Sequence, residues 1–165
     1  MKKKIAILGS TGSIGKTLID IIKNDKKNFE ITLLTTNKNY KELIKQAKYF
    51  RVKNLVITNN KAYNSVKKIN LNKKIKIYPN FDRFREIFKK KNDFIMSSIT
   101  GLDGLKPTLN SIRFTKNILI ANKEAIICGW NLINRELKKF KTNFIPIDSE
   151  HFSIWSLLQN HKTSN

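Results

Sequence analysis

The sequence has 165 residues, enough for one domain with its own core and a short further segment, and its 40% of apolar residues excludes a largely disordered chain. Lys and Arg outnumber Asp and Glu by 33 to 12, a net charge of +21 that by itself indicates a polyanionic partner such as nucleic acid. The lysines are spread in short runs without interleaved aromatic residues, so nucleic-acid binding is the less favoured interpretation. The single cysteine excludes an internal disulfide, and no apolar run is long enough to span a membrane, so we expect a cytoplasmic protein.

Seven short apolar runs follow one another along the chain, separated by stretches with helical spacing. The runs predicted as strands are Ile5 to Leu8, Ile31 to Leu34, Leu55 to Ile57, Ile75 to Tyr78, Phe94 to Met96, Ile118 to Ile120 and Phe144 to Ile147. Helices are predicted around four apolar sets: Ile14, Leu18, Ile21 and Ile22; Leu43, Ala47 and Phe50; Leu105, Leu109 and Ile112; and Ile126, Trp130, Ile133 and Leu137. The alternation predicts an α/β fold, with parallel strands joined by right-handed crossovers and helices on both faces of the sheet.

A glycine-rich segment directly follows the first predicted strand and opens the first predicted helix. It reads GSTGSIG from Gly9 to Gly15, with a glycine at every third position. In an open α/β sheet such a loop lets the pyrophosphate of a dinucleotide approach the backbone, and the start of the helix adds amide donors. Thr11 and Ser13 offer hydroxyl groups as well. We therefore predict a Rossmann-type nucleotide-binding domain; the alternative is a glycine turn that serves the fold alone.

The residues after the second predicted strand bear on the type of nucleotide. Enzymes that use NAD place a carboxylate there to bind the 2′-hydroxyl of the adenosine ribose. In this chain the strand is followed by Asn37, Lys38 and Asn39, with no acidic residue, and Lys38 offers a cation to a 2′-phosphate. The pattern favours NADPH over NADH, although Lys38 taken alone is equally well explained as a solvated lysine.

Polar residues also follow the last two predicted strands, at the edge of the sheet where ligands bind in this architecture. They are Asn122, Lys123 and Glu124 after the sixth strand, and Asp148, Ser149 and Glu150 after the seventh. Two carboxylates one residue apart suit a hard divalent cation such as Mg²⁺ or Mn²⁺. The alternatives are a helix cap at Asp148 or Ser149, and a solvated Lys123 instead of one that neutralises an anionic substrate.

Taken in order, these motifs resemble those of the 1-deoxy-D-xylulose 5-phosphate reductoisomerase family. Four segments of this chain resemble four segments of the family, taken in chain order: its start, the segment after its second strand, its middle and its metal-binding segment. In this chain they read KIAILGSTGSIGKTLIDII, NKNYKELIKQ, GLDGLKPTLNSIRFTKNILIANKEAIICG and FIPIDSEHFSIWSLL. Asn37 stands where family members usually have glycine. The resemblance covers almost the whole chain, and GSTGSIG, ANKE and DSEH are specific in combination.

The resemblance implies an NADPH-dependent enzyme that rearranges 1-deoxy-D-xylulose 5-phosphate and reduces the product to 2-C-methyl-D-erythritol 4-phosphate, on the route to isoprenoids. The residues implied to bind NADPH are Thr11, Gly12, Ser13, Ile14, Asn37, Lys38, Asn39, Asn122 and Glu124. The implied substrate contacts are Lys123, Ser149 and Glu150, of which Lys123 and Glu150 would be catalytic. Asp148 and Glu150 would bind Mg²⁺ or Mn²⁺, a Lewis acid that polarises the ketone of the sugar phosphate.

Chains of this family continue into a catalytic domain beyond the region that this sequence resembles. The expected organisation is therefore an NADPH-binding domain over residues 1–142 and the start of a catalytic domain over residues 143–165. The favoured hypothesis is an N-terminal fragment of such an enzyme, inactive by itself, whose complete relatives are homodimers. The alternatives are a non-catalytic NADPH-binding remnant and, less favoured, a basic nucleic-acid-binding protein.

Overall fold

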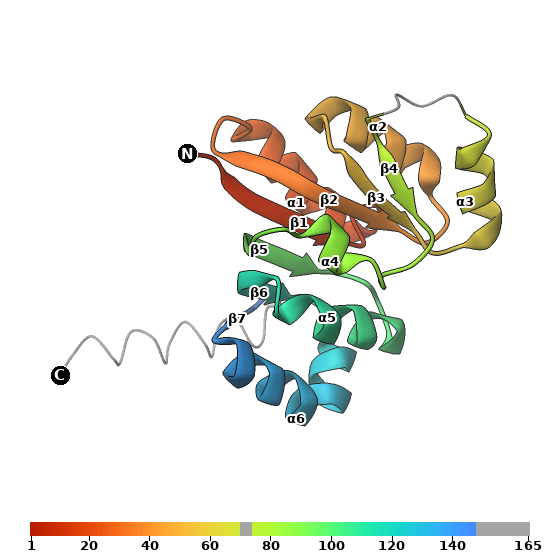
Figure 1. Cartoon of the computed structure of the whole chain (residues 1–165). Helices are drawn as coiled ribbons and strands as arrows, with labels where there is room; N and C mark the ends of the chain where they lie inside the picture. Colours follow the sequence, from red (N-terminus) through yellow and green to blue (C-terminus); the bar gives the residue numbers. More distant parts are fainter. Residues whose placement is uncertain (70–73, 148–165) are drawn as a thin grey trace.

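Strands and helices alternate along the chain and build one sheet with helices packed on it (Figure 1). The structure is a computed structural model that describes residues 1–69 and 74–147. The strands are β1 (Lys3–Leu8), β2 (Phe29–Thr36), β3 (Asn54–Ile57), β4 (Lys76–Tyr78), β5 (Asn92–Ser97), β6 (Thr115–Ile120) and β7 (Asn143–Pro146). The helices are α1 (Ser13–Asn24), α2 (Tyr40–Phe50), α3 (Asn60–Lys67), α4 (Phe84–Ile87), the short 3₁₀ turn η1 (Leu102–Gly104), α5 (Leu105–Ile112) and α6 (Lys123–Phe140). None of these helices has the length and apolar character needed to cross a membrane.

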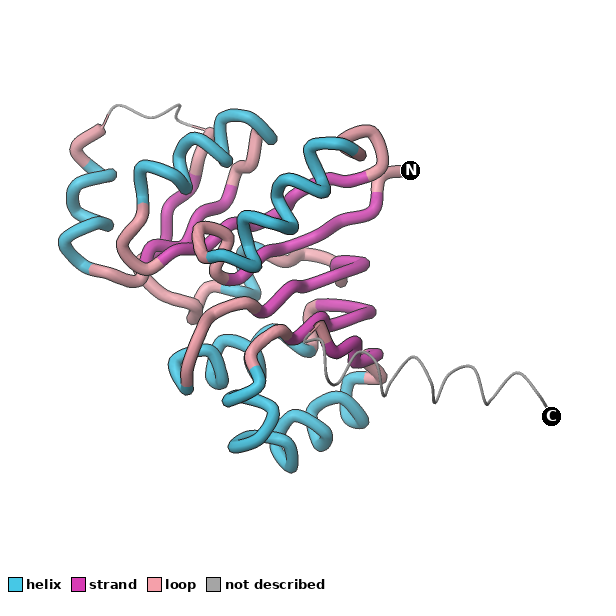
Figure 2. Tube along the Cα trace, turned by 180° about the vertical axis from the view of Figure 1, so that it is seen from behind, coloured by secondary structure: helices cyan, strands magenta, loops and turns pink. Residues whose placement is uncertain are grey.

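The seven strands lie in the order β4-β3-β2-β1-β5-β6-β7, and all neighbours are parallel. The chain moves outward from β1 to β4 on one side, returns to the centre at β5, and continues to β7 on the other side. Right-handed crossovers then place α1, α2 and α3 on one face and α4, α5 and α6 on the other. Figure 1 views the sheet from the side of α4 and α5, and Figure 2 from the side of α1 and α2. The predicted Rossmann-type α/β fold and its seven strands are confirmed.

The core lies on both faces of the central strand. Ile5 and Ile7 of β1 pack against α1, α2 and α3, whereas Ala6 and Leu8, on the opposite face, pack against α4. A third cluster, under α5 and α6, consists of Ile112, Ile118, Ile120, Ile126, Ile133 and Leu137. Because both faces are covered, Ile5 to Leu8 of β1 form a continuous buried apolar run instead of alternating with polar residues.

The apolar residues of helix α1 do not all face the sheet. Its buried residues are Gly15, Ile19 and Ile22, while Ile14 and Ile21 are 39% and 57% exposed. The cause is the close approach of the helix to the chain before it: a Cβ at Gly15 would overlap the carbonyl oxygen of Gly9. Gly15 must face inward, which also turns Ile19 and Ile22 inward at i+4 and i+7. Of the apolar set around which this helix is predicted, Ile22 is buried and Leu18 packs against the core, whereas Ile14 and Ile21 are exposed.

The last described strand continues the same sheet. β7 pairs in parallel with β6, and Ile145 lies opposite Leu119. The sheet therefore extends past residue 142, to Pro146. The division of the chain into domains at residues 142 and 143 stays a prediction.

The packing of α1 leads to a matched pair of substitutions. Ile19→Ala removes a side chain that is 2% exposed and should cost about 2–5 kcal/mol of unfolding free energy. Ile21→Ala removes the same atoms from a side chain that is 57% exposed and should change stability by less than about 0.5 kcal/mol. Urea denaturation followed by circular dichroism measures both; equal losses would contradict the orientation of α1.

Candidate nucleotide-binding site

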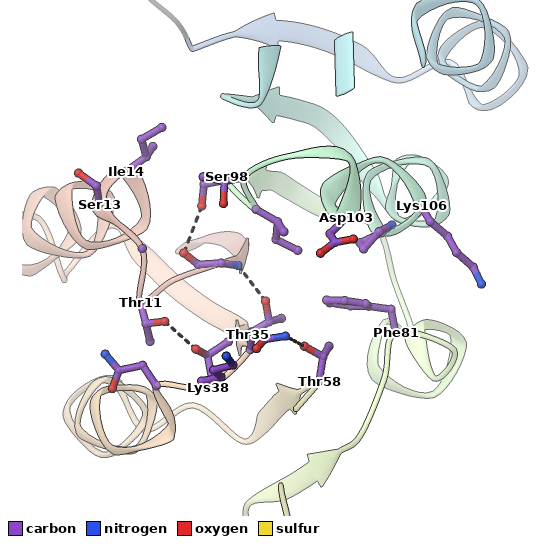
Figure 3. A pocket seen from close by; sticks show the side chains of 18 of the residues that line it. Thr11, Ser13, Ile14, Thr35, Lys38, Thr58, Phe81, Ser98, Asp103 and Lys106 are labelled. Atoms are coloured by element: carbon purple, nitrogen blue, oxygen red, sulfur yellow. Dashed lines mark hydrogen bonds between the residues drawn. The ribbon is translucent and has the colours of Figure 1, made fainter. Parts of the chain in front are cut away.

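A pocket of about 970 Å³ opens at the carboxyl ends of the central strands (Figure 3). Its walls come from the loops after β1, β2, β3 and β5, from the connection between β4 and α4, and from α1, η1 and α5. The strand order reverses between β1 and β5, and ligands of open α/β sheets bind at such a switch point. The lining residues are Gly9, Thr11, Gly12, Ser13, Ile14, Thr35, Thr36, Asn37, Lys38, Asn39, Thr58, Phe81, Ser98, Ile99, Thr100, Leu102, Asp103, Lys106 and Pro107.

Two glycines of the first loop are required by the loop itself. Gly9 has a φ of +86°, in the region that favours glycine, and a Cβ there would lie 2.9 Å from the carbonyl oxygen of Ser98. A Cβ at Gly15 would lie 2.7 Å from Ser10 Cα and closer still to the Gly9 carbonyl oxygen. At Gly12, in contrast, a Cβ would lie 3.5 Å from the same oxygen, an ordinary van der Waals distance. The fold therefore does not require glycine at position 12. Because Gly12 lines the pocket, the absence of a side chain there leaves room for a ligand.

Neighbouring elements hold this loop in place through hydrogen bonds. The hydroxyl Oγ1 of Thr35 accepts a bond from the Gly9 amide at 2.8 Å, and the Thr35 carbonyl accepts one from the Ser10 amide at 3.0 Å. The side chain of Gln46, in α2, donates to the Ser10 carbonyl at 3.0 Å, and the hydroxyl of Ser98 donates to the Gly9 carbonyl at 3.3 Å. β2, α2 and the end of β5 therefore fix the backbone of the loop before any ligand arrives.

The start of α1 is suited to an anion. Gly12 is the N-cap residue, with an extended backbone (φ −76°, ψ 174°) and no side chain to cover the first amide groups. Ser13 and Ile14 follow it in the first turn, and both line the pocket. Exposed amides and the positive end of the helix dipole together attract phosphate to such a position. The hydroxyl of Thr11, 2.6 Å from that of Thr36, adds a polar atom to the same wall.

The residues after β2 form another wall of the pocket. Asn37 Nδ2 donates to Thr58 Oγ1 at 3.0 Å and so joins the ends of β2 and β3. Asn39 Oδ1 accepts a bond from the Glu42 amide at 3.3 Å and caps α2. The backbone at Asn37 is not in the positive-φ region, so this position does not need the glycine that is usual in the resembling family. Lys38, between the two asparagines, is exposed and lines the pocket.

The charged residues of the lining favour an anionic ligand. Lys38 lies on the wall after β2, while Lys106 and Asp103 come from α5 and η1 across the pocket (Figure 3). Two cations against one carboxylate leave the lining positive. No carboxylate follows β2 within the lining, at the place where it would repel a 2′-phosphate.

Asn122 lies behind the pocket and contributes to its wall indirectly. It is 3% exposed, and its Oδ1 caps α6 by accepting a bond from the Ala125 amide at 2.9 Å. Its Nδ2 donates to the carbonyls of Gly101, at 2.6 Å, and of Ile99. Ile99 and Thr100 line the pocket, so Asn122 fixes the loop after β5 to the start of α6.

The other predicted site residues fall into two groups. Lys123 and Glu124 are exposed in the first turn of α6, and the pocket lining includes neither. Asp148, Ser149 and Glu150 lie outside the described residues, so the metal and substrate roles predicted for them stay predictions. Over residues 1–69 and 74–147, no three His, Cys, Asp or Glu side chains are gathered in a way that could hold a metal ion.

Several residues that shape the site were not predicted from the sequence. They are Thr35, Gln46, Thr58, Phe81, Asp103 and Lys106. Thr35 and Thr36 are buried polar residues at the end of β2, directly after the apolar Leu33 and Leu34, which marks Thr35 in retrospect as a polar group with a partner at the sheet edge. Gln46 and Phe81 follow no motif, because their positions depend on how α2 and the segment before α4 pack against the sheet.

A family model described as 1-deoxy-D-xylulose 5-phosphate reductoisomerase matches residues 5–129. The chain belongs to this family. The curated reductoisomerase of Pelagibacter ubique is 60% identical over 99% of the chain, and that of Clostridium acetobutylicum is 36% identical over 97%. The chain spans 42% of the length of each of these relatives.

Solved reductoisomerases have the same fold. The enzyme of Zymomonas mobilis in complex with NADPH matches with a TM-score of 0.83 and 32% identity, over 92% of this chain and 40% of its own. A reductoisomerase in complex with NADPH, fosmidomycin and magnesium gives a TM-score of 0.79 and 30% identity, over 90% of this chain and 37% of its own. A homoserine dehydrogenase from S. aureus, at 15% identity and a TM-score of 0.51, shares only the fold.

The different duties of the glycines predict different effects of adding a methyl group. Gly15→Ala should destabilise the fold by at least about 1–3 kcal/mol, because the new Cβ meets backbone atoms that have little freedom to move. Gly12→Ala should cost at most about 1 kcal/mol, the usual preference of an N-cap for glycine over alanine. Thermal melts of the two variants compare them directly. A Gly12→Ala protein as unstable as Gly15→Ala would show that the loop itself needs all three glycines.

Proposed function

We propose that this chain forms the NADPH-binding part of a 1-deoxy-D-xylulose 5-phosphate reductoisomerase. The observation that supports this most strongly is that one pocket joins the loop from Gly9 to Gly15 with Lys38 at the end of β2. The first provides amides for a pyrophosphate and the second a cation for a 2′-phosphate. The reductoisomerase of Zymomonas mobilis, to which the chain is similar, was solved with NADPH.

In this proposal the amides of Ser13 and Ile14 and the hydroxyl of Thr11 bind the phosphates, over the open space at Gly12. Asn37, Lys38 and Asn39 hold the adenosine end. Asn122 positions the loop after β5, and Glu124 lies at the start of α6, beyond the described lining. The bound nucleotide supplies a hydride to the substrate, and the chain's residues supply its binding and orientation.

The chemistry belongs to the complete enzyme. We propose that it rearranges 1-deoxy-D-xylulose 5-phosphate and reduces the product to 2-C-methyl-D-erythritol 4-phosphate, with Asp148 and Glu150 binding Mg²⁺ or Mn²⁺. Lys123, Ser149 and Glu150 would contact the sugar phosphate, and Lys123 would balance its negative charge. We further propose a division into residues 1–142 and 143–165 with the rest of the catalytic domain following, a homodimer, and a cytoplasmic location without a nucleic-acid partner.

The role of Lys38 is tested by its effect on cofactor preference. Lys38→Ala should weaken NADPH binding about tenfold, equivalent to about 1.4 kcal/mol for a lost charged contact, and leave NADH binding within about twofold. Gly12→Ala should weaken both nucleotides, because its methyl group occupies the space of the shared pyrophosphate. Isothermal titration calorimetry with the 165-residue chain measures the affinities.

Lys106→Ala is the matched control, since it removes a lysine from the opposite wall of the pocket. It should reduce NADPH affinity less than Lys38→Ala does. An unchanged NADPH-to-NADH ratio in Lys38→Ala would contradict the role of Lys38, and a chain that binds neither nucleotide would contradict the proposed function.

The 165-residue chain should bind NADPH without turning it over. It spans 42% of the length of its relatives, so most of a reductoisomerase lies beyond it. The assay follows NADPH absorbance with 1-deoxy-D-xylulose 5-phosphate and Mg²⁺ or Mn²⁺ present. Steady NADPH oxidation that disappears in Glu150→Gln would show that the chain is active by itself.

A further inference from the structure

Phe81 is an aromatic residue in the wall of the pocket that neither the glycine loop nor the residues after β2 account for. It lies in the connection between β4 and α4, and it lines the pocket together with Thr58 and Lys38. In Figure 3 its side chain extends into the pocket from the wall that faces the glycine loop, near Thr58 and Asp103. Its position is therefore on the side of the pocket that the phosphates would leave open.

The surroundings of Phe81 hold its ring on one side and leave another side free. Its centroid lies 5.7 Å from that of Phe84, with the planes tilted by 58°, and it packs at the margin of the cluster around Phe84 and Phe88. Phe84 and Phe88 are 2% and 6% exposed, whereas Phe81 is only half-buried and borders the pocket. A ring supported from behind by other rings is a rigid, apolar surface, which suits it to stacking.

The positions proposed for the pyrophosphate and for the 2′-phosphate determine which part of the nucleotide would contact the Phe81 ring. A dinucleotide with its pyrophosphate at Gly12 and its 2′-phosphate at Lys38 has its adenosine ribose between them, after β2. The base then extends from the ribose over the ends of β2 and β3, where Asn37 is hydrogen-bonded to Thr58. Phe81 and Thr58 both line this pocket (Figure 3).

We propose that Phe81 stacks on the purine base of the bound nucleotide and that, with the Asn37–Thr58 pair, it forms the purine subsite of this pocket. This inference rests on the proposed function, since it takes the nucleotide to lie across Gly12 and Lys38. Stacking of a base on an aromatic side chain contributes about 1–3 kcal/mol and does not depend on ionisable groups. Phe81 is therefore a binding determinant for the adenosine half of the cofactor and acts separately from the phosphate contacts.

The test measures binding of adenosine 2′,5′-bisphosphate and of inorganic pyrophosphate to the 165-residue chain and its variants. Phe81→Ala and Phe81→Leu should weaken the bisphosphate about 5- to 30-fold, which corresponds to about 1–2 kcal/mol. Phe81→Trp keeps an aromatic surface and should bind it within about threefold of the natural chain. Pyrophosphate has no base, so its affinity should be the same in the natural chain and in the three variants.

Phe81→Leu retains an apolar contact with Phe84, so it separates stacking from stability. Its melting temperature should stay near that of the natural chain while its bisphosphate affinity falls. Bisphosphate affinity that is unchanged in Phe81→Leu and Phe81→Ala would overturn the inference and leave the proposed function intact. Equal weakening of pyrophosphate and bisphosphate would also overturn it, because Phe81 would then only support the wall. A natural chain that binds no NADPH would instead contradict the proposed function itself.

Discussion

The close approach of α1 to the end of β1 determines much of the structure around the pocket. Gly15 has no space for a side chain between the helix and the Gly9 carbonyl, so the helix has one rotational setting. That setting buries Ile19 and Ile22 under the sheet and turns Ile14 toward the pocket. It also brings the first amides of the helix to the point where the strand order reverses. One steric contact thus links the packing of the core to the geometry of the anion site.

The hydrogen bonds around the loop extend this link to other elements. Thr35 holds the loop from β2, Ser98 from the position just after β5, and Gln46 from α2, all through backbone atoms of the loop. Asn122 holds the opposite loop in a similar way, from the start of α6. Since backbone groups of both loops already have partners, the pocket is preorganised, and its loops lose less conformational entropy when a ligand binds. The polar residues that stabilise the fold here are also those that shape the site.

Patterns in the sequence were enough to predict the fold class, all seven strands and the loop from Gly9 to Gly15. These features depend on local chemistry: apolar runs, helical spacing and glycines at a strand end. The exposure of Ile14 and Ile21 does not follow from the apolar spacing, because the contact of Gly15 with the previous turn sets the rotation of α1. α3 and α4 were not predicted, since α3 is largely polar and α4 has four residues. Phe81 could not be assigned to the pocket from the sequence, because its position depends on how α4 packs on β1 and β5, and no local pattern in the sequence indicates that packing.

Gly12 differs from the other two glycines of its loop in what its replacement would reveal. A side chain at Gly9 or Gly15 would strain the fold whether or not a nucleotide binds, so selection for the fold alone favours keeping these glycines. Gly12 meets no such requirement, and a lineage that no longer bound a nucleotide would accumulate other residues there and still fold. Among close relatives, retention of glycine at this position therefore reports selection for nucleotide binding, separately from selection for the fold. Within one loop, the outer glycines thus reflect selection for the fold and the middle glycine reflects selection for nucleotide binding.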